Sequence, residues 1–207
     1  MVSDSNSGPA TGKGQAAHDR IVAAAAELIY LYGLSGTKLE NVRTASATSG
    51  SQMSRHVGSR QGLVGQVLIA RRREMLSFHH DERFGSFDTI EALQAWADAC
   101  ATKLEGMGYI GGCVYGSLVS ELLPRPDEAL RAMITEGYDA WMSIFNSGFS
   151  AMRDRGELRE DADPKHLAAT LVCAHQGSAA LSQTLGSCGP MHSTLDAAVA
   201  YVRSFLA

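Results

Sequence analysis

The fold is decided by a short polar stretch, residues 37–63, which reads TKLENVRTASATSGSQMSRHVGSRQGL. It contains a single acidic residue and its pattern predicts two very short helices joined by a tight polar turn. In the second helix only Met53 and Val57, four residues apart, face inward, and Ser49 with Gln52 fits a capping box at its start. A helix that buries so little is expected to present its polar residues to something outside the protein.

Helical periodicity continues on both sides of this stretch. Residues 18–32 carry apolar side chains at helical spacing and are followed by Gly33, a helix-stopping signal. A longer fourth helix is predicted after Ser59, which is suited to be its N-cap. Three helices, with a short one presented by a tight turn, form the helix-turn-helix arrangement, in which the presented helix enters the major groove of DNA.

The remainder of the chain shows helical spacing and no stretch that alternates with period two for long enough to form a strand. The predicted fold is all-α, with about nine helices. This pattern predicts a three-helix DNA-binding domain, which the long fourth helix joins to a larger helical domain. The expected segments are a disordered tail over residues 1–17, the DNA-binding domain over 18–64 and the larger domain over 65–207.

Charge is distributed unevenly along the chain. Residues 18–73 contain eight Lys or Arg and three Asp or Glu, whereas residues 74–207 contain nine and eighteen, within a total net charge of -4. A basic N-terminal part on an acidic remainder is typical of a protein in which only the first part meets phosphate. A chance clustering of solvated charges is the alternative interpretation.

Other classes of function find little support in the sequence. The four cysteines lie far apart and are expected to be reduced, buried side chains of an intracellular protein. No apolar run approaches the roughly 18 residues of a membrane span, so we expect a cytoplasmic protein without a membrane partner. His79 to Glu82 are adjacent on a helix and diverge, which argues against a metal site. We find no catalytic constellation and expect neither an enzyme nor a cofactor.

Two residues of the short helix have the chemistry for reading bases. Gln52 can pair with adenine and Arg55 with guanine, each good pair contributing about 1–3 kcal/mol of discrimination. Gln52 has a second interpretation as the capping residue, and the two roles are compatible. Arg55 has little structural work on so short a helix, but base and phosphate remain alternative targets.

The same stretch resembles the DNA-binding region of the TetR family of transcriptional repressors. That family shows a threonine at the second helix, an Ala-Ala-Gly-Val-Ser turn, a Gly-Thr-Leu-Tyr-x-His-Phe helix and a Ser-Lys start to the fourth helix. The matching segments here are Thr37, residues 45–49, residues 51–57 and residues 59–60. Ala47, Ser54 and Val57 depart from the pattern, so the family's tyrosine is missing and phosphate contacts must come from other residues.

The resemblance implies a ligand-responsive repressor that binds a palindromic double-stranded DNA operator as a homodimer. It places His56 at the position of a histidine that contacts phosphate. The complete set of candidate DNA-binding residues is Thr37, Lys38, Ser49, Ser51, Gln52, Ser54, Arg55, His56 and Arg60. A regulator without a small-molecule ligand, an activator and, most remotely, a helical enzyme are the alternatives.

Residues 111–122 and 155–168 are similar to the C-terminal domain of the LmrA/YxaF-like branch of these regulators. The resemblance implies a cavity for a small, apolar effector, and dimerisation through the last two helices, predicted over about 164–185 and 193–206. Candidate ligand-binding residues are Trp96, Cys100, Met107, Tyr115, Trp141, Phe145, Phe149 and His175. Aromatic and methionine residues at helical spacing can equally be core, and His175 can be a satisfied core polar residue. Redox sensing by Cys100 and Cys113 is a weaker option.

Overall fold

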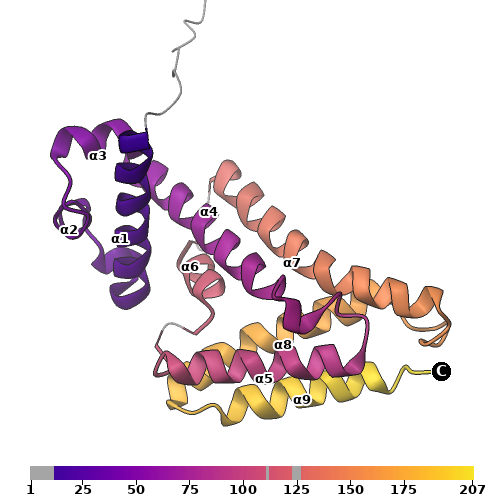
Figure 1. Ribbon diagram of the computed structural model, residues 1–207. Helices are drawn as coiled ribbons and strands as arrows, with labels where there is room; N and C mark the ends of the chain where they lie inside the picture. The colour runs from indigo at the N-terminus through magenta and orange to yellow at the C-terminus, as the bar shows by residue number, and fades with distance from the viewer. Residues whose placement is uncertain (1–11, 111, 123–126) are drawn as a thin grey trace, which may run out of the picture. The chain divides into compact units, whose positions relative to one another are not determined.

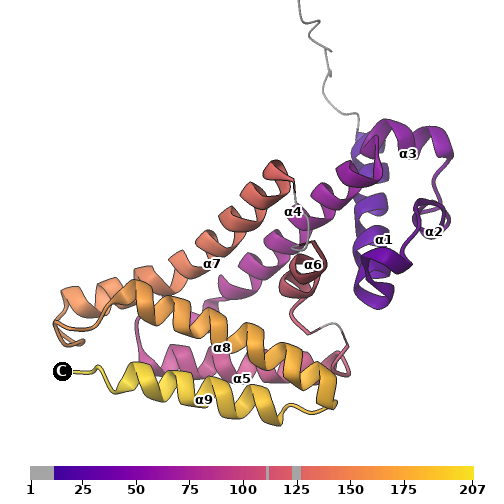
Figure 2. The same cartoon turned by 180° about the vertical axis from the view of Figure 1, so that it is seen from behind.

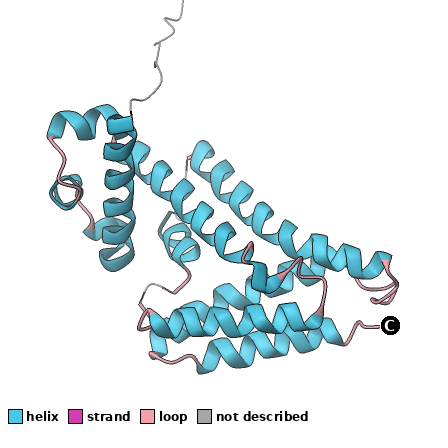
Figure 3. Ribbon diagram, viewed as in Figure 1, coloured by secondary structure: helices cyan, strands magenta, loops and turns pink. Residues whose placement is uncertain are grey.

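The computed structural model describes residues 12–110, 112–122 and 127–207, and within them the protein is built from α-helices (Figures 1 and 3). The described residues form nine α-helices and one 3₁₀ helix, with a single isolated bridge between Leu158 and Leu206 in place of any strand. The predicted all-α class is confirmed. The helices are α1 Gly12–Gly36, α2 Leu39–Ala45, α3 Gly50–Val57, α4 Arg60–His79, η1 Glu82–Phe84, α5 Ile90–Gly106, α6 Val114–Leu122, α7 Glu128–Asp154, α8 Pro164–Leu185 and α9 Gly189–Arg203.

The chain divides into two compact units. The N-terminal unit extends to Ala70 and the C-terminal unit begins at Arg71, so the division falls inside α4. The sequence placed this boundary between residues 64 and 65, one to two turns earlier on the same helix. Each unit has its own buried apolar core.

In the N-terminal unit, α1 packs against α2 and α3. Ile21 and Ala25 of α1 are fully buried, as the helical spacing predicted. The helix begins at Gly12, and Ala17 is buried, so the expected disordered tail is wrong for residues 12–17. Residues 1–11 of that expected tail lie outside the described residues. At its other end α1 is interrupted at Gly33, whose φ of 74° is non-helical.

In the C-terminal unit, α9 packs along both α5 and α8, and α7 packs along α8, as both views show (Figures 1 and 2). The core between these helices is rich in aromatic residues, including the fully buried Trp96 and Trp141. The proline start of α8 is as predicted, because Asp163 accepts a hydrogen bond from the amide of Lys165 and Pro164 occupies the first turn.

One expected boundary in this unit is wrong, and a second lies beyond the described residues. α9 begins at Gly189 rather than near residue 193, because Pro190 also supplies a helix start. α6 is described to Leu122, and the expected end of that helix at residues 123–126 lies outside the described residues. Among the residues that the structure describes, no helix is both long and apolar enough to span a bilayer.

Candidate nucleic-acid interface and buried cavity

The turn between α2 and α3 is held by polar side chains. Ser46 and Thr48 are buried, and their hydroxyl groups are hydrogen bonded to each other at 2.8 Å. Between them the exposed Ala47 adopts a φ of 51°, in the left-handed region that favours glycine. This is the position at which the resembling sequences have glycine, and here the turn is made at some conformational cost.

The start of α3 is a complete capping box, as predicted. The hydroxyl of Ser49 accepts the amide N–H of Gln52 at 3.2 Å, and the Ser49 amide donates to Gln52 Oε1 at 2.9 Å. The Ser51 hydroxyl lies 3.0 Å from that of Ser49. Bidentate pairing with adenine would use both Oε1 and Nε2 of Gln52. The side chain therefore acts as a cap in this conformation, through one lone pair of Oε1.

The outer face of α3 is exposed and basic. Met53 and Val57 are buried as expected, whereas Ser54 and Arg55 are exposed. Arg55 makes no hydrogen bond or ion pair with any residue that the structure describes. His56 is half-buried, and its ring lies edge-on to His18 of α1, with 6.3 Å between ring centroids. A guanidinium presented in this way is available to an external partner.

The structure gives Thr37 and Arg60 roles within the unit. Thr37 is 4% exposed, and its hydroxyl donates to the carbonyl of Gly33 at 2.9 Å. Arg60 donates from Nη1 to the carbonyl of Thr37 at 2.6 Å and from Nη2 to the carbonyl of Leu34. Arg60 thereby ties the start of α4 to the segment between α1 and α2. Of the two residues expected at the α2 start, only Lys38 is exposed.

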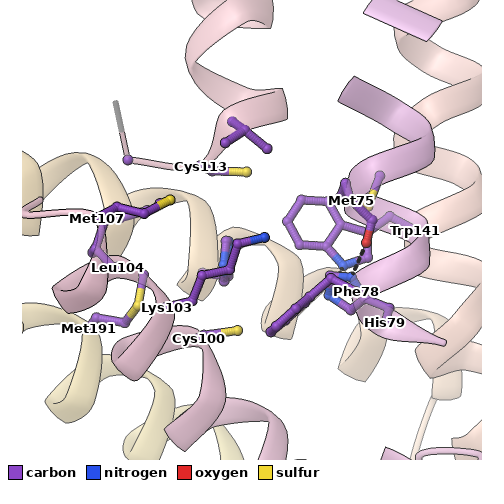
Figure 4. A pocket seen from close by; sticks show the side chains of 14 residues that line it. Met75, Phe78, His79, Cys100, Lys103, Leu104, Met107, Cys113, Trp141 and Met191 are labelled. Atoms are coloured by element: carbon purple, nitrogen blue, oxygen red, sulfur yellow. Dashed lines mark hydrogen bonds between the residues drawn. The ribbon is translucent and has the colours of Figure 1, made fainter. Parts of the chain in front are cut away.

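The C-terminal unit contains a cavity of about 50 Å³ beside the aromatic core (Figure 4). Four of the eight candidate ligand-binding residues line it: Cys100, Met107, Trp141 and His175. The other four are fully buried or nearly so and do not line it: Trp96, Tyr115, Phe145 and Phe149. For those four the structure supports the alternative interpretation, a place in the packed core.

His79 joins the core to the cavity wall. Its ring is 2% exposed, and Nδ1 donates to the carbonyl of Met75 at 2.8 Å. Its Nε2 accepts the indole N–H groups of Trp96 at 3.0 Å and Trp141 at 2.7 Å. Because Nε2 must be unprotonated to accept, the ring is neutral, and burial lowers the pKa of His79 to about 4. The His79 to Glu82 stretch, set aside as a metal site, thus contains a structural histidine.

The cavity also has polar lining residues that the sequence pattern did not single out. Lys103 lines it from α5, and its Nζ lies 4.8 Å from the ring centroid of Phe78. Cys113 lines it from the start of α6 and accepts a weak hydrogen bond from Gln176 Nε2 at 3.5 Å. Lys103 could have been predicted as a lining residue because it follows the candidate Cys100 by three positions, and residues three apart share a helix face.

A second hollow adjoins the cavity. It has a volume of about 280 Å³ and shares Gly112 and Cys113 with the first. Gln176 lines it from α8 and Tyr138 from α7. The Gln176 contact with Cys113 therefore lies where the two hollows meet. Burial raises the pKa of both Cys113 and Cys100, so these thiols are protonated and weakly nucleophilic.

Within the described part of the chain, no group of three His, Cys, Asp or Glu residues is placed to hold a metal ion. The polar groups of the cavity are thus a lysine, two neutral histidines and two protonated thiols. This set can bind a small molecule through charge and hydrogen bonds.

Comparison with known proteins agrees with this architecture. Residues 89–198 match the family model described as the tetracyclin repressor-like C-terminal domain. The HTH-type transcriptional repressor DhaR from Mycobacterium sp. (strain GP1) is 25% identical over 150 residues, which cover 70% of this chain and 72% of DhaR.

Solved structures share the fold over nearly the whole chain. A TetR transcriptional regulator from Chloroflexus aurantiacus J-10-FL superposes with a TM-score of 0.82 at 21% identity, covering 95% of this chain and 98% of that one. The regulatory protein TetR from Rhodobacter sphaeroides gives 0.78 at 20% identity, covering 89% and 98%. The family model spans more than half of the chain, and the helix-turn-helix precedes it. The chain therefore belongs to the TetR family of transcriptional regulators.

Proposed function

We propose that this regulator is a repressor that binds a palindromic operator as a homodimer and is released when a small effector occupies the C-terminal cavity. The single observation that carries the DNA-binding part is the exposed, unpartnered Arg55 on a capped helix that buries only Met53 and Val57. The relative DhaR is a repressor by name, which supports repression rather than activation.

For the DNA side, we propose that Arg55 meets a base edge or phosphate and that His56 and Ser54 contact the backbone. Lys38, Ser49 and Ser51 are proposed as further backbone contacts because their side chains are exposed near the same helix. The net charge of +5 over residues 18–73 supports an approach to phosphate. We leave Thr37 out of the proposed interface and give Arg60 a supporting role, because both are engaged within the unit.

For the dimer, we propose that α8 and α9 of two copies form a four-helix bundle. α8 leaves a stripe of small and apolar side chains exposed at helical spacing: Cys173, Gly177, Ala180, Leu181, Thr184 and Leu185. Leu181 is 50% and Leu185 62% exposed, which is costly for adjacent turns of an isolated chain. Small residues on the same stripe would let a second helix approach closely.

For the effector, we propose that filling the cavity favours a dimer with the wrong separation of its two α3 helices. Operator half-sites lie about 34–36 Å apart. The route is supported by α4, which supplies Met75, Phe78 and His79 to the cavity wall and begins at Arg60 in the N-terminal unit. To change the ratio of operator-binding to released dimers from 99:1 to 1:99, the effector must bind the released form more strongly by about 5.5 kcal/mol.

The DNA-binding proposal is tested by a gel shift with the DNA that flanks this protein's own gene, repeated at several salt concentrations. We expect Arg55→Ala to weaken binding about tenfold or more, and His56→Ala to weaken it less. Arg153→Ala is a matched control, because Arg153 is an exposed arginine of α7 outside the proposed interface. If both Arg55→Ala and His56→Ala bind like the wild type, the proposed interface is wrong.

The dimer proposal is tested by light scattering coupled to gel filtration. The double variant Leu181→Lys/Leu185→Lys should shift the protein from dimer to monomer, because four lysines would meet across the two-fold axis. Ile110→Lys is the control, since Ile110 is also an exposed apolar residue of the C-terminal unit but lies outside α8 and α9. A double variant that remains dimeric would contradict the proposed interface.

We also propose that the C-terminal unit is of the LmrA/YxaF-like type and that the protein acts in the cytoplasm, where its operator would lie. The first assignment is supported by the sequence of residues 111–122 and 155–168. The second follows from a function exerted on chromosomal DNA.

A further inference from the structure

The cavity has one charged side chain among the described residues that line it, and that is Lys103. Figure 4 shows Lys103 extending from α5 toward the middle of the cavity. Its closest acid is Glu74, with 3.9 Å between Nζ and Oε1, and Arg71 Nη1 already pairs with Oε2 of the same carboxylate at 2.7 Å. One carboxylate thus serves two cations, so it does not fully neutralise the Lys103 ammonium, whose side chain is 36% exposed.

The other titratable groups around the cavity supply no compensating negative charge. Burial, reinforced by the charge of Lys103, lowers the pKa of His79 to about 4 and that of His175 to about 3. Burial raises the pKa of Cys100 and Cys113, against the opposing effect of Lys103. At neutral pH all four groups are therefore uncharged while they lie within reach of the lysine's field.

His175 presents a buried polar atom without a partner. Its Nδ1 makes no hydrogen bond in the described part of the chain, although it is closed off from solvent. The ring is held in place against Trp141 and Trp96, with centroid separations of 5.1 Å and 6.0 Å. Buried polar atoms are nearly always hydrogen bonded, and His175 is one of the residues that line the cavity, so its unpartnered Nδ1 is a candidate partner for a ligand atom. In its Nδ1–H tautomer, His175 can donate to an anionic oxygen.

The rest of the wall is apolar and adjustable. Phe78, Leu104 and Val114 contribute carbon surface, and three methionines, Met75, Met107 and Met191, also line the cavity. A dry cavity of about 150 Å³ accommodates benzene, so the present volume of about 50 Å³ suits a molecule of only a few carbon atoms. Methionine side chains rotate easily and can enlarge the space for a somewhat larger apolar body.

We propose that the effector cavity recognises a small apolar carboxylate, whose charge pairs with the Lys103 ammonium and whose second oxygen accepts a hydrogen bond from His175 Nδ1. The inference rests on the proposed function, because it names the class of molecule that the proposed effector site takes. Charge-assisted hydrogen bonds are about twice as strong as neutral ones, and desolvation by the apolar wall strengthens them. The cavity should therefore bind a carboxylic acid more tightly than the neutral amide of the same acid.

The test is calorimetric titration of the full chain at pH 7 without DNA, using matched pairs of acid and amide: butyrate and butyramide, hexanoate and hexanamide, benzoate and benzamide. We expect at least one acid to bind about tenfold or more tightly than its amide. Lys103→Met should reduce that preference to less than about twofold, whereas Lys103→Arg should keep most of it. Lys165→Met, which removes an exposed lysine of α8 away from the cavity, should leave the preference unchanged.

Circular dichroism establishes that each variant is folded, and Lys103→Arg keeps the test decisive if Lys103→Met does not fold. Equal binding of acid and amide, a preference that survives Lys103→Met, or no binding of any of the three acids at about 10 mM would each overturn the inference. The proposed release from DNA is judged separately, by adding a bound acid to the protein–operator complex. An acid that binds selectively without weakening operator binding refutes the effector role and leaves the ligand class standing.

Discussion

The indole N–H of Trp141 on α7 donates a 2.7 Å hydrogen bond to Nε2 of His79 on α4. The same nitrogen accepts a hydrogen bond from the indole N–H of Trp96 on α5. One imidazole therefore joins three helices of the C-terminal unit. His79 also lines the cavity, so the contact couples the packing of the core to the shape of the cavity.

Replacing His79 by leucine should destabilise the C-terminal unit by about 2–4 kcal/mol. The substitution leaves two buried indole N–H groups without an acceptor, and each orphan costs about 1–3 kcal/mol. Urea unfolding followed by tryptophan fluorescence measures this directly, because the two tryptophans of the chain are Trp96 and Trp141. His80→Leu, at an exposed neighbouring histidine, should change stability by no more than about 0.5 kcal/mol. Equal effects of the two substitutions would refute the role assigned to His79.

Stability should fall as the pH is lowered from 6.5 toward 5. The pKa of His79 is about 4 and that of His175 about 3 in the folded protein, against an ordinary value of 6.5. In this window the unfolded chain binds protons that the folded chain does not, so each imidazole contributes a slope that rises from about 0.7 kcal/mol per pH unit at pH 6.5 to nearly 1.4 at pH 5. Urea unfolding at pH 5, 5.5, 6 and 6.5 gives the slope. His79→Gln should reduce it by about half, while His192→Gln, at an exposed site, should leave it unchanged.

Replacing Ala47 by glycine should stabilise the N-terminal unit by about 0.5–1 kcal/mol. The φ of 51° at Ala47 is disfavoured for a residue with a Cβ, and glycine removes that cost. Amide hydrogen exchange across residues 39–57 is a suitable measurement, because the tryptophans lie in the other unit. Ala45→Gly, at the last residue of α2, should not stabilise the unit, because Ala45 has no positive φ to relieve. Exchange in Ala47→Gly that is as fast as in wild type would count against strain at this turn.

Substitutions of Arg60 and Arg55 should have different effects: the first should lower the stability of the N-terminal unit, and the second should weaken DNA binding. Arg60→Met removes donors to the carbonyls of Thr37 and Leu34 and should destabilise the N-terminal unit by about 1–3 kcal/mol. Arg55→Met should leave stability within about 0.5 kcal/mol of wild type and weaken only DNA binding. Hydrogen exchange and gel shifts on the same samples measure both effects. A stable Arg60→Met protein that loses DNA binding would instead identify Arg60 as a direct contact.

Gly148 on α7 should not tolerate alanine. A Cβ there would lie 2.3 Å from the carbonyl oxygen of Phe87 and 2.6 Å from that of Ser86, and neither backbone atom can rotate away. We expect a loss of about 1–3 kcal/mol, measured by tryptophan fluorescence in urea. Gly106→Ala is the control, because a Cβ at Gly106 meets nothing within 4 Å. A Gly148→Ala protein as stable as the control would show that α7 can move away from Phe87 at little cost.

The features that the sequence predicted correctly depend on residues close together in the chain. The capping box of Ser49 and Gln52 spans three residues, and the proline start of α8 spans two, so composition at fixed offsets is sufficient to identify them. The inward position of Met53 and Val57 follows from helical periodicity in the same way. The DNA-binding role of the exposed residues stays a prediction until it is measured.

The cavity could be predicted only in part. Trp141 and Phe145 share one stripe of α7 and have the same sequence signature, yet Trp141 lines the cavity and Phe145 is packed in the core. Which of them meets a gap depends on how α4, α5 and α8 pack around that stripe, and periodicity within one helix carries no information about that packing.

By itself, the sequence determined the helical class, the helix-turn-helix and the starts of α3 and α8, because these arise from interactions within about one helical turn. Only the tertiary structure decided that Arg60 braces the segment before α2, that His79 accepts two indoles, and that Lys103 is the charged residue of the cavity. The bond from Arg60 to Thr37 and the bonds from the two indoles to His79 join residues 17 to 62 positions apart. Such pairings are set by the packing of whole helices, which no local pattern specifies.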